Sequence, residues 1–258
     1  MLSDEQRERY HRHIMLKEVG GKGQEKLLAG KVLIIGVGGL GSPVSLYLSA
    51  AGVGTIGIAD PDRVELSNLQ RQIAHHTGDI GRPKVISARE KMAAMNPDIK
   101  VKIHDVLVTA ENIMAIIEDY DFVVDATDNF ESKFLINDAC ILAGKPYSHG
   151  GILRFSGQTI TVKPGDSACY RCIFPFPPPE DVDAPCSRAG VMGVLPGVIG
   201  CIQATEAIKY LLGEGSLLTG RLLTYDVLKM KFREVYIRKN PGCPICGENP
   251  SITELDVK

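Results

Sequence analysis

The 258-residue chain is 44% hydrophobic and 23% charged, so it is long enough to form one large α/β domain with a substantial core. Its formal net charge of −2 argues against non-specific binding to nucleic acid. The first residues lack the basic-then-apolar pattern of a signal peptide, and glycines and a proline interrupt the longest apolar stretch, 191–202. We therefore expect a cytoplasmic protein that binds neither nucleic acid nor a membrane.

Strand-like and helix-like segments alternate along the first 150 residues. A polar, helical segment at 1–30 comes first, and segments rich in Val and Ile or bounded by turn signals then predict strands. The predicted strands are 31–36, 55–60, 99–107, 121–126 and 146–150, and the predicted helices are 41–52, 83–95, 110–119 and 130–143. This alternation predicts an α/β fold, Rossmann-like and doubly wound, with a mostly parallel sheet.

The pattern changes after residue 150. It predicts a strand at 155–165, a proline-rich crossover loop at 174–185, a buried helix near 197–212 and an antiparallel hairpin at 221–239. We therefore expect a single domain over residues 1–258. It would comprise the helical segment 1–30, a nucleotide-binding half at 31–150, and a second half at 151–258 with an antiparallel C-terminal extension.

A glycine cluster follows the first predicted strand. Gly36, Gly38 and Gly41 satisfy the G-x-G-x-x-G spacing of a phosphate-binding loop, and Gly39 adds a fourth glycine. Asp60 ends the second predicted strand, where it could accept hydrogen bonds from ribose hydroxyls. The pattern predicts a bound nucleotide without saying which one.

Polar and cationic residues follow at the same edge of the predicted sheet. Asn68 and Arg71 lie in "LSNLQRQ", and Lys84 lies in "GRPKV" at a predicted helix start. Arg suits bidentate contact with phosphate, and Lys acts as a point charge. Two cations beside a phosphate-binding loop favour an enzyme that cleaves a triphosphate. An enzyme that only binds a dinucleotide would need fewer positive charges there.

A carboxylate follows the fourth predicted strand. Asp128 in "VVDATDNFESK" is a candidate Mg²⁺ ligand, because one carboxylate plus substrate phosphates commonly holds this ion. Asp128 could instead cap the next helix, unless Asn129 provides the cap and leaves Asp128 free. Asp125 is the less favoured ligand.

Four of the seven cysteines form two Cys-x2-Cys pairs, and this spacing predicts a structural four-thiolate zinc site over a redox pair. The predicted ligands are Cys169, Cys172, Cys243 and Cys246. Cys140 and Cys201 lie in apolar helices and are expected in the core. Cys186 follows the proline loop near Arg188, where either a reactive thiolate or an inert loop cysteine fits.

Several segments together resemble one family. "GVGGLGS", "LSNLQRQ", "GRPKV", "ATDN", "CYRC", "AGVMGVLPGVIGCIQATEAIK" and "GCPICG" are similar, in order and spacing, to those of the ThiF/MoeB/HesA-type adenylyltransferases. These relatives of ubiquitin-activating enzymes act on ubiquitin-like sulfur carrier proteins. The resemblance implies that ATP occupies the loop and that the carrier's C-terminal glycine carboxylate attacks the α-phosphorus, releasing pyrophosphate.

The resemblance also implies roles for the matching residues, with ATP, Mg²⁺ and Zn²⁺ as ligands. Gly38, Gly39 and Gly41 would bind the nucleotide, with Gly39 at the α-phosphate and Asp60 at the ribose. Asn68, Arg71 and Lys84 would contact the triphosphate, and Asp128 would hold Mg²⁺.

Further implications of the resemblance concern partners. Arg12 would reach the nucleotide of the partner subunit in a homodimer, and Cys186 is a candidate for a covalent link to the carrier. Residues 151–258 would form the carrier-binding and zinc-bearing half. A carrier ending in Gly-Gly is expected, together with a separate sulfur donor such as a rhodanese or cysteine desulfurase.

Three alternatives to a carrier-activating adenylyltransferase differ from it in function class or in substrate. An NAD-dependent oxidoreductase would explain the glycine loop and Asp60 but would leave Arg71, Lys84 and Asp128 without a shared task. A zinc-stapled module could hold ATP without catalysis. A tRNA-modifying relative would favour a more basic chain. The carrier and its pathway, whether molybdopterin, thiamine or another, do not follow from the sequence.

Overall fold

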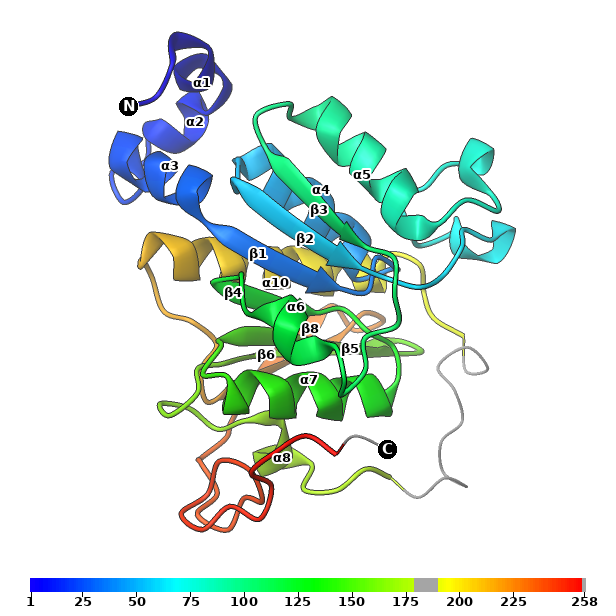
Figure 1. Cartoon of the computed structure of the whole chain (residues 1–258), viewed down its shortest axis with the longest axis vertical. Coiled ribbons are helices and arrows are strands. Elements are labelled where there is room, and N and C mark those ends of the chain that lie inside the picture. The colour runs from blue at the N-terminus through cyan, green and yellow to red at the C-terminus, as the bar shows by residue number, and fades with distance from the viewer. Residues whose placement is uncertain (179–189, 257–258) are drawn as a thin grey trace.

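The strands of the computed structural model, which describes residues 1–178 and 190–256, form one eight-stranded sheet (Figure 1). Their order across the sheet is β3-β2-β1-β4-β5-β6-β7-β8. The strands are β1 (Lys31–Ile35), β2 (Thr55–Ala59), β3 (Lys100–His104), β4 (Phe122–Asp125), β5 (Tyr147–Leu153), β6 (Ser156–Val162), β7 (Arg221–Asp226) and β8 (Lys231–Tyr236).

Strands β1 to β5 pair in parallel, and β6 to β8 continue the sheet in antiparallel fashion. The predicted doubly wound, mostly parallel sheet with an antiparallel extension is therefore confirmed. The chain reverses its direction of winding at β1, which lies between β2 and β4. In such sheets ligands bind at this switch point, beyond the carboxyl ends of the strands.

The helices match the predicted order, with shorter ends in places. They are α1 (Asp4–Arg9), α2 (His11–Ile14), α3 (Gly20–Ala29), α4 (Gly41–Ala51), α5 (Lys84–Met95), α6 (Ile113–Ile117), α7 (Phe130–Leu142), α8 (Tyr170–Ile173) and α10 (Leu195–Leu212), with short 3₁₀ turns at Leu66–Asn68 and Thr77–Asp79. Helix α6 is shorter than predicted because the Asn112 side chain accepts a hydrogen bond from the Thr109 backbone N–H in a turn before it.

Two hydrophobic cores cover the two faces of the sheet. Val32 and Ile34 of β1 pack in one core with α4, α5 and α10, while Leu33 and Ile35 pack in the other with α6 and α7. The central strands are therefore apolar at consecutive positions, as expected for parallel strands buried on both sides. Cys140 is fully buried as predicted, whereas Cys201 is only partly buried.

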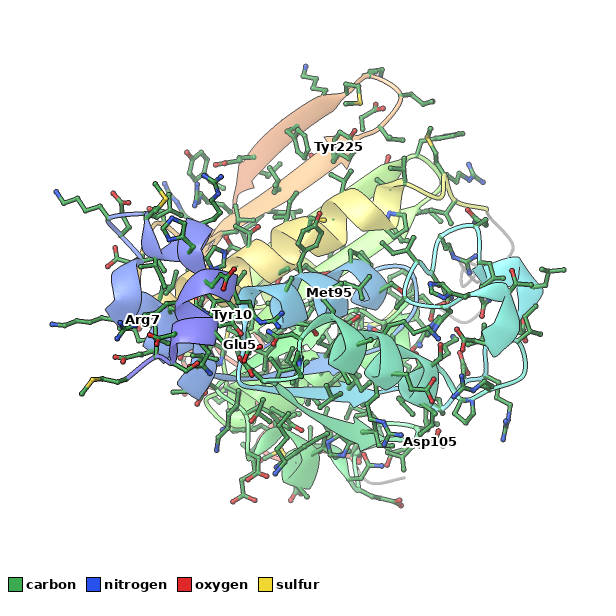
Figure 2. The ribbon with its side chains drawn as sticks, turned by 90° about the horizontal axis from the view of Figure 1, so that it is seen from above. Glu5, Arg7, Tyr10, Met95, Asp105 and Tyr225 are labelled. Atoms are coloured by element: carbon green, nitrogen blue, oxygen red, sulfur yellow. The ribbon has the colours of Figure 1, made fainter. Side chains whose placement is uncertain are left out.

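The N-terminal segment packs on the end of α5. The Arg9 guanidinium donates to the carbonyl of Met95 at 3.2 Å, and the buried Tyr10 hydroxyl accepts a hydrogen bond from Asn96 at 2.8 Å (Figure 2). Helix α3 then leads into the start of β1, so the segment lies at the amino-terminal side of the parallel strands (Figure 1). In the described part of the chain, no helix is long and apolar enough to cross a membrane.

Helix α10 crosses α4 at very close range because Gly200 has no side chain. A Cβ at this position would lie 2.5 Å from the carbonyl oxygen of Leu40 and 2.6 Å from the Pro43 ring. On the same helix, a Cβ at Gly197 would meet no atom within 4 Å.

We therefore expect opposite effects from two matched substitutions on α10. Gly200→Ala should lower the free energy of unfolding by about 1–3 kcal/mol through overpacking. Gly197→Ala should raise it by up to about 1 kcal/mol through higher helix propensity. Urea unfolding measures both, and equal effects of the two substitutions would contradict the close α10–α4 contact.

Candidate active site

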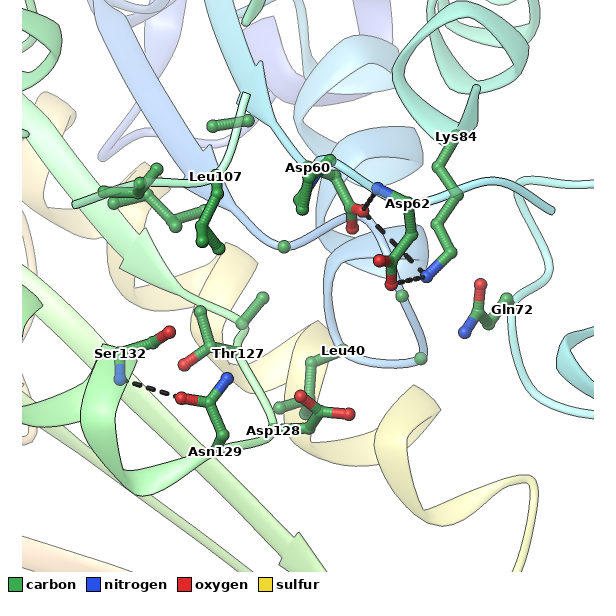
Figure 3. Close-up of a pocket in the computed structure, with 18 of the residues that line it drawn as sticks. Leu40, Asp60, Asp62, Gln72, Lys84, Leu107, Thr127, Asp128, Asn129 and Ser132 are labelled. Carbon is green, nitrogen blue, oxygen red and sulfur yellow. Dashed lines mark hydrogen bonds and ion pairs between the residues drawn. The ribbon is translucent and has the colours of Figure 1, made fainter. Parts of the chain in front are cut away.

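A cavity of about 270 Å³ lies where the loops after β1, β2 and β4 meet (Figure 3). It collects most of the predicted site residues, namely Gly38, Gly39, Asp60, Arg71, Lys84 and Asp128. Gly41, Asn68 and Arg12 do not line it, and Cys186 lies outside the described residues. Segments that are far apart in sequence thus supply one site.

The glycine loop passes closely over the end of β4. Gly36 has a positive φ of 94°, and a Cβ there would lie 2.7 Å from the carbonyl oxygen of Ala126. A Cβ on Gly41 would lie 1.9 Å from the Gly36 carbonyl oxygen, so Gly41 serves the packing of α4 against the loop. Gly39 faces Pro196 and the Arg71 side chain, which lie 3.1 Å and 3.5 Å from the position of a Cβ.

A buried cation stands beside two carboxylates on one side of the cavity (Figure 3). Lys84 Nζ lies 2.8 Å from Asp62 Oδ2 and 3.9 Å from Asp60 Oδ1. The backbone N–H groups of Val37 and Asp62 donate to the two Asp60 oxygens at 2.7 Å and 2.9 Å. Burial raises the pKa of Asp60, and Lys84 and these hydrogen bonds only partly oppose that shift. Asp60 is therefore fixed in place, and each oxygen keeps one lone pair for a ligand hydroxyl.

The sequence pattern did not single out Asp62. Its position three residues after the end of β2, at the ligand-binding edge, was the available signal. Its side chain is 65% exposed, so its pairing with Lys84 faces solvent. A ligand phosphate could replace the Asp62 carboxylate as the partner of Lys84.

Asn68 ends the turn at Leu66–Asn68, and Arg71 follows three residues later. Arg71 lines the cavity and donates to the Ser67 carbonyl oxygen at 3.0 Å. Asn68 is buried, and its Oδ1 accepts the Glu65 backbone N–H at 3.1 Å, so it shapes the turn. Gln72 also lines the cavity, and its buried Oε1 has no hydrogen-bond partner among the described residues.

Asp128 projects into the cavity as a free carboxylate (Figure 3). Asn129 caps α7 by accepting the Ser132 N–H at 2.8 Å, which decides between the two capping alternatives. Asp128 is exposed and makes no hydrogen bond or ion pair within the described residues. An unpartnered carboxylate beside a phosphate-binding loop fits the ligand set of Mg²⁺.

Asp125 is enclosed by a buried polar cluster and is not accessible to a metal ion. Its carboxylate lies 3.3 Å from Lys133 Nζ and 2.8 Å from His149 Nδ1, and it accepts the Thr127 hydroxyl at 2.6 Å. Burial alone would raise the pKa of Asp125, but Lys133 and the hydrogen bonds from His149 and Thr127 hold it below its usual value. The sequence pattern missed Lys133 and His149, because only the fold brings them to Asp125.

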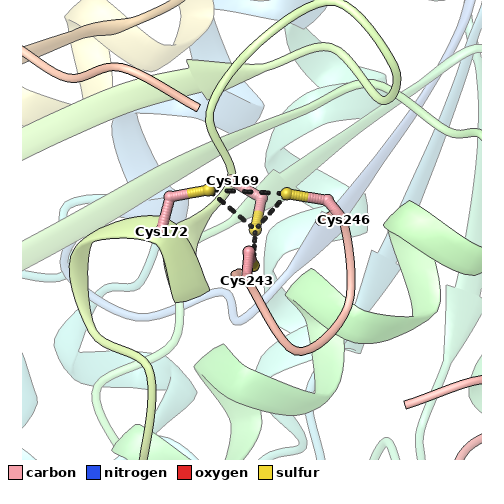
Figure 4. A group of neighbouring side chains, drawn as sticks. All are labelled: Cys169, Cys172, Cys243 and Cys246. Carbon is pink, nitrogen blue, oxygen red and sulfur yellow. Dashed lines mark hydrogen bonds between the residues drawn. The ribbon is translucent and has the colours of Figure 1, made fainter. Parts of the chain in front are cut away.

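The four paired cysteines converge in one cluster (Figure 4). Neighbouring Sγ atoms lie 3.4–3.9 Å apart, close to the spacing of about 3.8 Å that a tetrahedron with Zn–S bonds of about 2.3 Å requires. The Asn240 N–H donates to Cys172 Sγ at 3.4 Å. A hydrogen bond from the Cys169 thiol lowers the pKa of Cys172. The cluster therefore has the donors and geometry for one tetrahedral ion.

Helix α7 holds the first Cys-x2-Cys pair against the sheet. Arg171, within that pair, forms a bidentate buried ion pair with Asp138, with N–O distances of 2.7 Å and 2.6 Å. Asn137 accepts the backbone N–H of Tyr170 at 2.9 Å. The same helix thus contacts the cysteine cluster and begins next to Asp128.

Comparison with known proteins places this site in a family. The model of the ThiF family matches residues 10–245. The chain belongs to the ThiF family. It is 47% identical to a sulfur carrier protein adenylyltransferase of Thermus thermophilus, over 97% of this chain and 94% of that protein. It is 48% identical to a SAMP-activating enzyme E1 of Haloferax volcanii, over 99% of this chain and 95% of that protein.

Two further comparisons concern a longer relative and a solved structure of the same fold. A probable adenylyltransferase/sulfurtransferase, MoeZ of Mycobacterium tuberculosis, is 45% identical over 98% of this chain and 64% of its own length. A crystal structure of Escherichia coli MccB with ATP has the same fold, with a TM-score of 0.82 and 24% identity over 93% of this chain and 74% of that one.

The buried cluster around Asp125 predicts a pH dependence of stability. Burial, and secondly Lys133, lower the pKa of His149. Below the unfolded-state pKa of about 6.5 the unfolded chain therefore binds more protons at this histidine, and stability falls as the pH falls.

His149→Asn cannot titrate but keeps an N–H donor for Asp125. Between pH 7 and pH 5 it should therefore lose less free energy of unfolding than the wild type does. His75 and His104, whose pKa values are also lowered by burial, are present in both proteins and cancel in the comparison. Equal losses would show that His149 titrates normally in the folded chain.

Proposed function

We propose that this ThiF-family chain is an adenylyltransferase that uses ATP to activate the C-terminal glycine carboxylate of a ubiquitin-like sulfur carrier protein. The observation that carries the proposal is the free carboxylate of Asp128 in one cavity with Arg71, Lys84 and the glycine loop. A dinucleotide oxidoreductase has no shared use for these three charged groups. The names of the Thermus and Haloferax relatives support the same activity and class of partner.

The cavity residues suit successive parts of ATP. Asp60, with both oxygens fixed by backbone N–H groups, would accept ribose hydroxyls through its remaining lone pairs. The backbone of Gly38 and Gly39, which lines the cavity, would face the phosphates. Arg71 and Lys84 would neutralise phosphate oxygens, and Lys84 would exchange Asp62 for the ligand.

In the reaction, a carboxylate oxygen of the carrier's terminal glycine attacks the α-phosphorus of ATP. An acyl O–P bond forms, the bond from the α-phosphorus to the bridging oxygen breaks, and pyrophosphate leaves with that electron pair. The attacking carboxylate is already ionised at neutral pH, so no general base is required. Arg71 and Lys84 stabilise the charge that develops on the phosphate oxygens. Asp128 would hold Mg²⁺, which would further neutralise the charge of the triphosphate.

The four-cysteine cluster would hold Zn²⁺ in a structural role. Its ligands come from segments more than 70 residues apart in sequence, so one ion would link α8 to the segment that follows β8. All four positions are used by thiols, which leaves no open coordination position for catalysis.

A homodimer would complete the site. Arg12 is exposed on α2, at the amino-terminal end of the parallel strands (Figure 1), whereas the cavity lies beyond their carboxyl ends. Arg12 could therefore act only on the nucleotide of a partner subunit. Four expectations stay predictions: a covalent link at Cys186, carrier binding by residues 151–258, a separate sulfur donor, and a cytoplasmic location.

The experiment that tests the proposed function is ATP–pyrophosphate exchange with a panel of ubiquitin-like carriers that end in Gly-Gly. Asp128→Asn removes one charge without changing the shape of the side chain. It should reduce carrier-dependent exchange by about 100-fold or more, because the triphosphate loses its bound cation. Its thermal unfolding should be unchanged, since Asp128 has no partner within the described residues.

Glu131→Gln is the matched control for that experiment. It also removes an exposed carboxylate, in the first turn of α7, and should exchange like the wild type. Normal exchange in Asp128→Asn would rule out this residue as the Mg²⁺ ligand. Absence of exchange with every carrier would favour a module that binds ATP without catalysis.

A further inference from the structure

A continuous set of buried contacts runs from the cysteine cluster to the candidate active site. Tyr170 lies between Cys169 and Cys172, and its ring packs on the ring of His149 with the centroids 4.6 Å apart. His149 Nδ1 lies 2.8 Å from Asp125 Oδ2. Tyr170, His149 and Asp125 are each at most 2% exposed. Three side chains therefore span the distance between two sites that the sequence separates by more than 40 residues.

Asp125 in turn shapes the loop that presents Asp128. Its Oδ1 accepts both the backbone N–H of Thr127 at 3.0 Å and the Thr127 hydroxyl at 2.6 Å. Lys133 Nζ donates to the Thr127 carbonyl oxygen at 2.8 Å. Asp128 is the next residue, so its backbone direction depends on how the Asp125 carboxylate is oriented.

His149 is buried, and its ring makes one hydrogen bond among the described residues, that of Nδ1 with Asp125. Its Nε2 is buried and has no hydrogen-bond partner among the described residues. The ring orientation therefore depends on the hydrogen bond to Asp125 and on the adjacent face of Tyr170. A shift of Tyr170 would be passed on to the Asp125 carboxylate.

We propose that His149 is a positioning residue that couples the four-cysteine cluster to Asp128, so that metal bound in the cluster strengthens the binding of Mg²⁺·ATP in the cavity. This inference rests on the proposed function, since it takes Asp128 as the Mg²⁺ ligand. The cluster fixes Tyr170 through its flanking cysteines, Tyr170 fixes the His149 ring, and His149 fixes Asp125.

Binding of Mg²⁺·ATP, followed by fluorescence, tests the coupling without relying on activity. The chain contains no Trp, so Phe130→Trp places one reporter two residues after Asp128, at a side chain that is 41% exposed. In this background, His149→Ala should raise the half-saturating concentration of Mg²⁺·ATP by 10-fold or more, the usual effect of losing a group that orients a metal ligand. Binding of ATP without Mg²⁺ should change little.

Conservative variants and removal of the cluster metal distinguish a positioning role of His149 from general damage to the fold. His149→Asn retains the donor to Asp125 and should recover most of the affinity, while Tyr170→Phe retains the ring and should bind like the wild type. Removing the cluster metal, followed by dialysis free of chelator, should weaken Mg²⁺·ATP binding in the wild type and add nothing further in His149→Ala.

The outcomes separate this inference from the proposed function. Unchanged Mg²⁺·ATP affinity in His149→Ala, or the same loss on metal removal in both proteins, would overturn the coupling. If the wild type shows no Mg²⁺-dependent binding of ATP, the proposed function fails instead. If His149→Ala does not fold, Tyr170→Leu, which keeps His149 and Asp125, repeats the test. A wild-type loss of Mg²⁺·ATP affinity on metal removal in Tyr170→Leu would overturn the inference.

Discussion

The structure depends on the neutralisation of one buried charge, that of Asp125 at the carboxyl end of the central strand β4. Lys133 from α7 and His149 from β5 both reach it, and Gln203 from α10 donates to its backbone carbonyl oxygen at 2.8 Å. Leaving a buried charge without its partner typically costs about 3–5 kcal/mol. Two strands and two helices are therefore held in one arrangement where the loop to Asp128 begins.

The glycine loop depends on the same place. Gly36 passes over the Ala126 carbonyl, one residue after Asp125, and Gly41 allows α4 to start directly against Gly36. The phosphate-binding loop and the loop that carries Asp128 thus share a contact, which fixes their separation. Catalysis by positioning and charge neutralisation requires such fixed geometry more than it requires reactive side chains.

Much of this arrangement could be predicted from local patterns. Alternating apolar and helical segments gave the strand and helix order, and the carboxyl-edge rule correctly brought Asp60, Arg71, Lys84 and Asp128 to one cavity. The Cys-x2-Cys pairs likewise predicted the convergence of four thiols. These features depend on residue spacing within short segments or on a general property of parallel sheets.

The remaining features depend on tertiary contacts that spacing does not encode. Gly41 and Asn68 do not line the cavity; Gly41 packs closely against Gly36, and Asn68 shapes the turn at Glu65, contacts that spacing did not predict. Asp62 was missed because its partner, Lys84, lies 22 residues further along the chain. The Lys133–Asp125–His149 cluster was missed because a charged residue beside an apolar segment reveals neither its partner nor its burial. The choice between Asp128 and Asn129 as the helix cap also needed the actual backbone geometry.

Family membership and the residues of the cavity together indicate that the carrier's carboxylate attacks the α-phosphorus of ATP. The intact mass of a Gly-Gly-ended carrier, measured after incubation with the chain, Mg²⁺ and ATP, tests this most directly. We expect the carrier to gain one adenylyl group at its C-terminal glycine, with pyrophosphate released in equal amount. A carrier that gains a phosphoryl group with release of ADP would contradict this expectation, because the cavity would then direct attack at the γ-phosphorus.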